Sequence, residues 1–188
     1  MKEVGAVNIN TQLEGAVVLD ANTASKLGNV TDVLINLDKG VAMALLFRTS
    51  SGAQYALAPK DVHIHTEANA VIAFGEPVTD PAELRKMLEK GVQAQDELVD
   101  SAVVTKDGRL LGRLSGVFLQ TETMRAIYHI TSSEWQRLFG GGFYLAGNVP
   151  CAYSRAGARL IAPADTRRHV FRSLAESVEA QMQEAAAG

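Results

Sequence analysis

Hydrophobic residues in the first part of the chain recur at alternate positions within short runs. Val33, Ile35 and Leu37 occupy alternate positions, and a further apolar run follows directly after Asp38-Lys39-Gly40. A period of two indicates a half-buried strand, and a glycine that tolerates positive φ suits the intervening turn. Such runs, separated by turn signals, predict about six short strands within residues 1–78. We expect these strands to form a small antiparallel barrel or sandwich.

The period changes in residues 79–97. Asp80 followed by Pro81 is typical of a helix N-terminus, since both residue types favour the first turn. Leu84 and Leu88 then lie four residues apart on one face, and Gly91 is a plausible stop. We therefore predict a linker helix in this segment.

The second half of the chain repeats the first. Ala-Val-Val followed by Leu-Gly occurs within residues 15–35 and again within residues 101–119. A third match, Ala-Pro-x-Asp, occurs at 58–61 and at 162–165. Three matches in the same order predict two tandem copies of one β-unit, the second spanning residues 98–165.

The second copy diverges after its third predicted strand. An insertion occupies residues 132–157, and residues 166–188 show the spacing of an amphipathic helix. Its apolar stripe is Val170, Phe171, Leu174, Val178 and Met182. The second copy is therefore expected to lack its last two strands, whose place the insertion or the C-terminal helix covers. The stripe packs on the barrels or pairs with a second chain, giving a homodimer.

The motif Leu27-Gly28-x-Val30-x-Asp32, with Pro59-x-Asp61-Val62 further on, resembles the PRC-barrel domain. This small β-barrel is shared by the photosynthetic reaction-centre H subunit and the ribosome-maturation factor of bacteria. The resemblance covers residues 14–75 and, less closely, 99–165, where Gly116 stands in the place of the aspartate. It implies a mainly β protein of two tandem small antiparallel PRC-like barrels. It also implies an adaptor that docks on other macromolecules.

Composition narrows the classes of partner. The chain of 188 residues has 18 basic and 21 acidic side chains and a net charge of −3, which gives no general attraction to DNA or to acidic lipid. Its single cysteine, Cys151, excludes an intrachain disulfide. No apolar window is long enough for a membrane span. A cytoplasmic protein is expected.

His63 and His65 have the best metal-like spacing. Residues two apart on a strand point to the same face, so both imidazoles reach one ion. The alternative is a pair of surface histidines, because Val62 and Ile64 are expected to occupy the buried face of the strand. This is the favoured interpretation. Cys151 is expected to be an inert thiol. No cofactor is expected.

The insertion holds the main candidates for a protein interface, because aromatic residues dominate binding hot spots. They are Trp135, Phe139, Phe143 and Tyr144. The alternative is that Trp135 and Phe139 plug the incomplete second barrel.

Arginines gather around the start of the predicted C-terminal helix. The candidates for contact with an acidic partner or RNA are Arg167, Arg168 and Arg172, with Arg155 and Arg159 nearby in the sequence. They equally fit the solvated face of a helix.

Taken together, the residues favour a non-enzymatic adaptor or scaffold with a protein partner, since no catalytic constellation emerges from the sequence. A ribosome- or RNA-associated factor is the first alternative. A small-ligand binder, with the insertion lining a pocket between the barrels, is the second.

Overall fold

The structure is a computed structural model that describes residues 5–78, 92–132 and 142–187. Most of the predicted linker helix therefore lies outside the described residues. The part of that segment that is described forms a short strand, β8 (Val92–Ala94), and a single helical turn, α2 (Gln95–Leu98).

The first sheet is built from seven strands of the first copy and the linker. Its strand order is β5-β4-β3-β2-β7-β6, with β8 paired to β3. The bounds of its strands are β2 (Val17–Asp20), β3 (Lys26–Asn36), β4 (Val41–Arg48), β5 (Gln54–Leu57), β6 (Val62–His65) and β7 (Ala70–Ala73).

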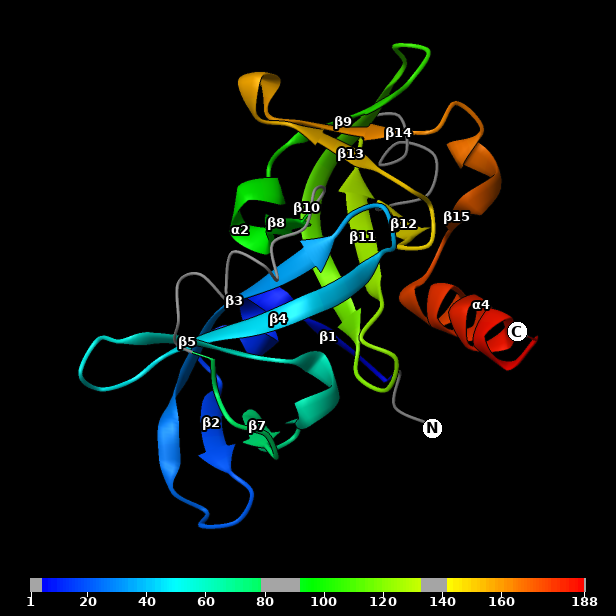
Figure 1. The fold of residues 1–188 in the computed structure, drawn as a ribbon. Helices are drawn as coiled ribbons and strands as arrows, with labels where there is room; N and C mark the ends of the chain where they lie inside the picture. The colour runs from blue at the N-terminus through cyan, green and yellow to red at the C-terminus, as the bar shows by residue number, and fades with distance from the viewer. Residues whose placement is uncertain (1–4, 79–91, 133–141, 188) are drawn as a thin grey trace.

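The second sheet has eight strands in the order β13-β14-β9-β10-β11-β12-β15, with β1 paired to β10. Figure 1 shows it above the first sheet, with β3 and β4 running between the two. The bounds are β1 (Ala6–Asn8), β9 (Ala102–Thr105), β10 (Leu110–Gln120), β11 (Ala126–Thr131), β12 (Phe143–Ala146), β13 (Ala152–Ser154), β14 (Arg159–Ala162) and β15 (Val170–Phe171).

The mainly β prediction is confirmed, but the prediction of antiparallel sheets is wrong. β2 pairs in parallel with β7, and β9 pairs in parallel with β14, so both sheets are mixed. Each sheet also has two ends in its pairing order, so the described strands close neither into a barrel. The long connection from β2 to β7, which runs through strands β3 to β6, is what allows a parallel pair.

The two sheets share one strand order. β5-β4-β3-β2-β7-β6 in the first copy corresponds to β12-β11-β10-β9-β14-β13 in the second. The prediction that the second copy lacks its last two strands is therefore wrong. Residues 143–154, assigned to an insertion from the sequence, supply β12 and β13 of the repeat itself.

The third sequence match, Ala-Pro-x-Asp at 58–61 and 162–165, does not fall at equivalent positions of the two copies in the fold. Residues 58–61 connect β5 to β6, whereas residues 162–165 begin at the last residue of β14. The segment that corresponds to 58–61 is 147–151, between β12 and β13. The strand order therefore defines which segments of the two copies correspond, and the four-residue match is coincidental.

The copies exchange their leading strands. β1 precedes the first copy but pairs with β10 of the second, with Asn8 opposite Phe118. β8 precedes the second copy but pairs with β3 of the first, with Ala94 opposite Leu34. Each copy thus completes the sheet of the other, and the arrangement is close to twofold symmetric.

The pseudo-twofold axis passes through a bridge between Val41 and Arg125. The Ala42 N–H donates to the Met124 carbonyl at 2.8 Å, and the Ala126 N–H donates to the Gly40 carbonyl at 2.9 Å. Buried apolar side chains from both sheets belong to one continuous core around this junction. The core does not divide into two domains.

The C-terminal helix is shorter than its predicted range of 166–188. Residues Thr166–His169 form a 3-10 turn, Val170 and Phe171 form β15 against β12, and helix α4 covers Leu174–Ala187. Val178 is buried, whereas Met182 remains 45% exposed. The predicted stripe is thus split between a strand and a helix that packs on β12 of the same chain.

Asp32 caps α2 from across the boundary between the copies. Its carboxylate accepts from the Val33 N–H at 2.7 Å and from the Gln95 N–H at 3.2 Å. The second copy has Gly116 at this position, and a Cβ there would lie 3.2 Å from the Asn8 amide nitrogen. Asn8 instead caps the turn Ile9–Leu13, accepting from the Thr11 N–H.

The ionisation of Asp32 is expected to lower the free energy of unfolding as pH rises. Burial, and then the neighbouring Asp96 carboxylate, raise the pKa of Asp32 from 3.8 to about 6, against the opposing effect of its N–H donors. The folded chain therefore keeps a proton that the unfolded chain releases, and stability present below pH 4 is lost as pH rises to about 6. Allowing for the partial exposure of Asp32, this loss is about 1–2 kcal/mol.

We expect Asp32→Asn to remove this pH dependence, because the amide oxygen still accepts the capping hydrogen bonds but does not ionise. Urea unfolding at intervals from pH 4 to 8 measures it. Wild type should lose stability relative to the variant across this range. Parallel curves for the two proteins would show that Asp32 does not titrate as described.

Candidate functional site

The outer faces of the two sheets differ at matched positions. The first sheet has Leu34, Leu46, Ala56 and Ala94 at four positions related by the strand pairing. The equivalent positions of the second sheet are Phe118, His129, Tyr144 and Asn8. An apolar set in one copy is thus an aromatic and polar set in the other.

The exposure of the two sets differs as well. Leu34 and Ala56 are buried in a small cluster with Val92. Their counterparts Phe118 and Tyr144 are only half-buried. At these two of the four matched positions, the second sheet is therefore the more accessible.

Phe118, His129 and Tyr144 form one group, which we call the aromatic face. The rings of His129 and Tyr144 stack with centroids 4.7 Å apart at 23°. Phe118 meets Tyr144 edge-on at 5.8 Å and His129 at 6.4 Å. Such contacts hold the rings in defined positions and present both apolar surface and polar edges.

Ser115 adds a polar group to the edge of the aromatic face. It lies at a bulge where β10 shifts register against β11, between Leu114 and Gly116. Its hydroxyl is 2.8 Å from Nδ1 of His129 and also donates to the His129 carbonyl at 3.1 Å. Burial lowers the pKa of His129, which favours the neutral imidazole. The face therefore offers hydrogen-bonding groups without a fixed charge.

The sequence-predicted interface residues fall in three places. Trp135 and Phe139 lie outside the described residues. Phe143 points into the core and is 2% exposed, so its predicted interface role is wrong. Tyr144, the next residue on β12, faces outward and belongs to the aromatic face.

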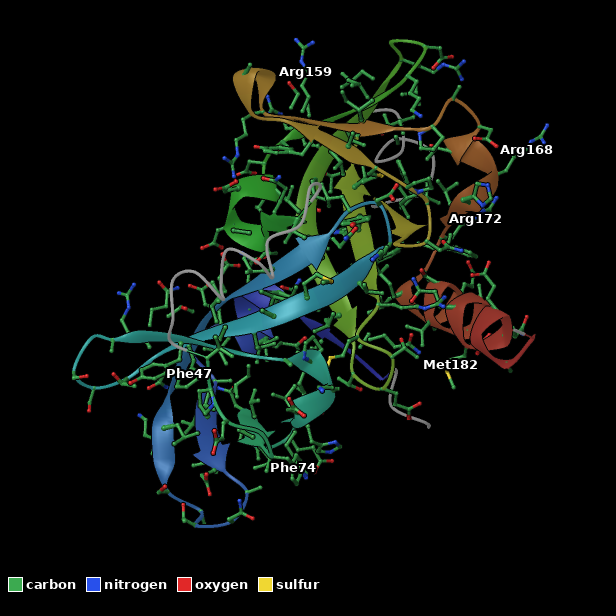
Figure 2. The ribbon with its side chains drawn as sticks, viewed as in Figure 1. Phe47, Phe74, Arg159, Arg168, Arg172 and Met182 are labelled. Carbon is green, nitrogen blue, oxygen red and sulfur yellow. The ribbon has the colours of Figure 1, made fainter. Side chains whose placement is uncertain are left out.

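The arginine candidates do not form one surface. Arg155 pairs with Glu97 at 3.1 Å on the side of α2. Figure 2 shows Arg159 at the opposite side of the second sheet from Arg168 and Arg172. The backbone N–H of Arg172 donates to the Glu176 carboxylate in the first turn of α4. Arg167 lies in the 3-10 turn before β15, and its side chain is outside the described part.

A cleft lies between the copies, with a volume of about 850 Å³. One wall is β6 with the residues on either side of it, and the other is the turn Thr121–Met124 between β10 and β11. His63 and His65 line it, and both are exposed. The lining comes from strands and turns of the repeat and contains no described residue of segment 132–157.

Cys151 has the environment of an unreactive thiol. It is buried, its N–H donates to the Leu37 carbonyl at 3.0 Å, and burial raises its pKa to about 12. At neutral pH the thiolate fraction is negligible, so nucleophilic chemistry is not expected here.

The described residues contain no group of three or more histidine, cysteine or acidic side chains placed to hold a metal ion. No helix among them is long and apolar enough to cross a membrane.

Comparison with protein-family models finds no match to the chain. Comparison with curated proteins finds none either.

Proposed function

We propose that the chain is a tandem PRC-barrel-like adaptor that binds a protein partner through the aromatic face. The observation that carries this proposal is the replacement of Leu34, Leu46 and Ala56 by Phe118, His129 and Tyr144 at matched positions of the repeat. The strand order repeated in both copies supports the tandem-unit part of the proposal.

Two physical arguments favour a protein partner. Aromatic side chains give a large contact area at a low entropic cost, which is why they concentrate in binding hot spots. The face also lacks a fixed charge, because His129 is held neutral and Ser115 and Tyr144 carry hydroxyls. A polyanion such as RNA requires a concentrated positive charge, which the separated arginines do not supply.

The repeat provides its own variant design. Phe118→Leu, His129→Leu and Tyr144→Ala together give the second sheet the residues that the first sheet already carries at the same positions. The sheet is therefore expected to fold with all three changes. Phe74→Ala is the matched control, because Phe74 is a 64% exposed aromatic that directly follows β7 in the other copy.

The experiment is affinity capture with quantitative mass spectrometry on wild type, the triple variant and the control. We expect a protein retained in stoichiometric amount by wild type and by Phe74→Ala, and reduced at least about tenfold with the triple variant, since loss of hot-spot residues exceeds about 1.4 kcal/mol. Equal retention by all three proteins, after circular dichroism shows that all are folded, would contradict the proposal.

A further inference from the structure

The two histidines of β6 form a pair on one face of the strand. Val62 and Ile64 are buried, and His63 and His65 are exposed in strict alternation. The imidazole centroids are 5.7 Å apart with the ring planes at 77°. At this separation a small rotation of each side chain directs a nitrogen of both rings toward one point between them.

The pair lies in the cleft between the copies rather than on a convex surface. Lys60, Glu67 and Glu122 line the same cleft, so its fixed charges sum to a net negative value near the histidines. Such a lining is complementary to a cation. Glu67 is two residues beyond His65, in the turn that follows β6, which places a carboxylate next to the imidazole pair.

We propose that His63 and His65 form the core of a binding site for a divalent transition metal, with Glu67 as the third protein ligand. Imidazole suits Zn²⁺, Cu²⁺ and Ni²⁺, and two imidazoles with one carboxylate leave further coordination positions open. Among the described residues no group of three ligands is already assembled, so the proposed site requires the exposed Glu67 side chain to rotate toward the pair. This inference is independent of the aromatic face.

The first copy alone carries this site. The corresponding edge strand of the second sheet is β13, whose residues are Ala152, Tyr153 and Ser154. The segment before β13 is also packed against the other copy, since the Cys151 N–H donates to the Leu37 carbonyl and Val149 is 3% exposed. Both copies line the cleft, but the histidine pair comes from the first copy alone.

The test is isothermal titration of the tag-free full chain with Zn²⁺, and separately with Cu²⁺, at pH 7.5. We expect one equivalent to bind, with Cu²⁺ tighter than Zn²⁺, and a rise in melting temperature on saturation. His63→Gln and His65→Gln should each weaken binding at least about tenfold, because loss of a direct ligand exceeds the effect of losing an outer-shell partner. His169→Gln, which changes an exposed histidine outside the cleft, should leave affinity unchanged.

Glu67→Gln tests the contribution of the third ligand independently of the two histidines. We expect this variant to bind the metal more weakly but still with a one-to-one ratio. Absence of heat and of a melting shift with both metals up to 1 mM (about the weakest affinity of interest) would overturn the proposal. So would binding that His63→Gln and His65→Gln leave intact. Each substitution changes an exposed side chain, so we expect every variant to fold. A circular dichroism spectrum that matches that of wild type verifies this.

Discussion

Replacing Gly40 by alanine is expected to lower the free energy of unfolding by about 3–4 kcal/mol, one of the largest effects of a point change in this chain. Gly40 has φ of +64°, where a side chain is strained. A Cβ would also overlap the backbone carbonyl of Gly147, which belongs to the other copy. The Gly40 carbonyl accepts the Ala126 hydrogen bond at the junction, so any shift that relieves the overlap disturbs the contact between the sheets.

Gly108→Ala is the control that separates backbone strain from close approach. Gly108 has φ of +84°, but a Cβ there meets nothing within 4 Å. Gly108→Ala should lower the free energy of unfolding by only about 1 kcal/mol, because it strains the left-handed conformation without a steric overlap. Urea unfolding of both variants measures the difference. Equal losses would mean that the two copies do not meet closely at Gly40.

Neither half of the chain is expected to fold by itself. A fragment of residues 1–85 contains β1, which belongs in the second sheet, and lacks β8, which completes its own. A fragment of residues 86–188 has the reverse defect. Ile9, which follows β1, and Leu98, which follows β8, are both fully buried in the shared core, so separation exposes apolar surface in each fragment.

Equal amounts of the two fragments, mixed, should recover the cooperative unfolding that each lacks alone. Far-UV circular dichroism during urea titration follows this directly. Each fragment should give a broad, low-amplitude change, and the mixture a single transition whose midpoint depends on concentration. Two fragments that unfold cooperatively by themselves, with no effect of mixing, would contradict the strand exchange.

The sequence predicts the internal repeat because close packing of the backbone requires the same residue type at matched positions of both copies. The glycines at 28 and 112 each allow the strand to pass close to a neighbouring backbone carbonyl, that of Arg48 and of Thr131 respectively. A requirement of this kind leaves the same residue in both copies. The parallel pairs left no such mark, because parallel pairing is set by connections between distant strands rather than by local pattern.

Of the aromatic face, the sequence predicts Tyr144 but neither Phe118 nor His129 as an interface residue, and the reason is one of register. Ala42 corresponds to Ala126, but Ala44 corresponds to Ile127, because Met43 is an extra residue at a bulge in β4. A gapless alignment of the copies therefore places Ile130, a core residue, opposite Leu46, where His129 belongs. A one-residue offset on a strand exchanges its inner and outer faces.

Gly116 shows how a mismatch in a motif is resolved by a distant residue. From the sequence it only weakened the resemblance of the second copy to the first. In the fold it leaves room for Asn8, 108 positions earlier in the chain, which supplies a cap of its own. The compensation depends on the exchange of β1, which no local pattern indicates.

The most direct test of the proposed binding face is photo-cross-linking in cells with p-benzoyl-phenylalanine in place of Tyr144, compared with the same group in place of Phe74. Phe74 is the more exposed of the two positions, so nonspecific contact favours it. The adaptor proposal predicts a discrete cross-linked protein from position 144 and none from position 74. The same products at equal yield from both positions, or no product from position 144, would contradict it.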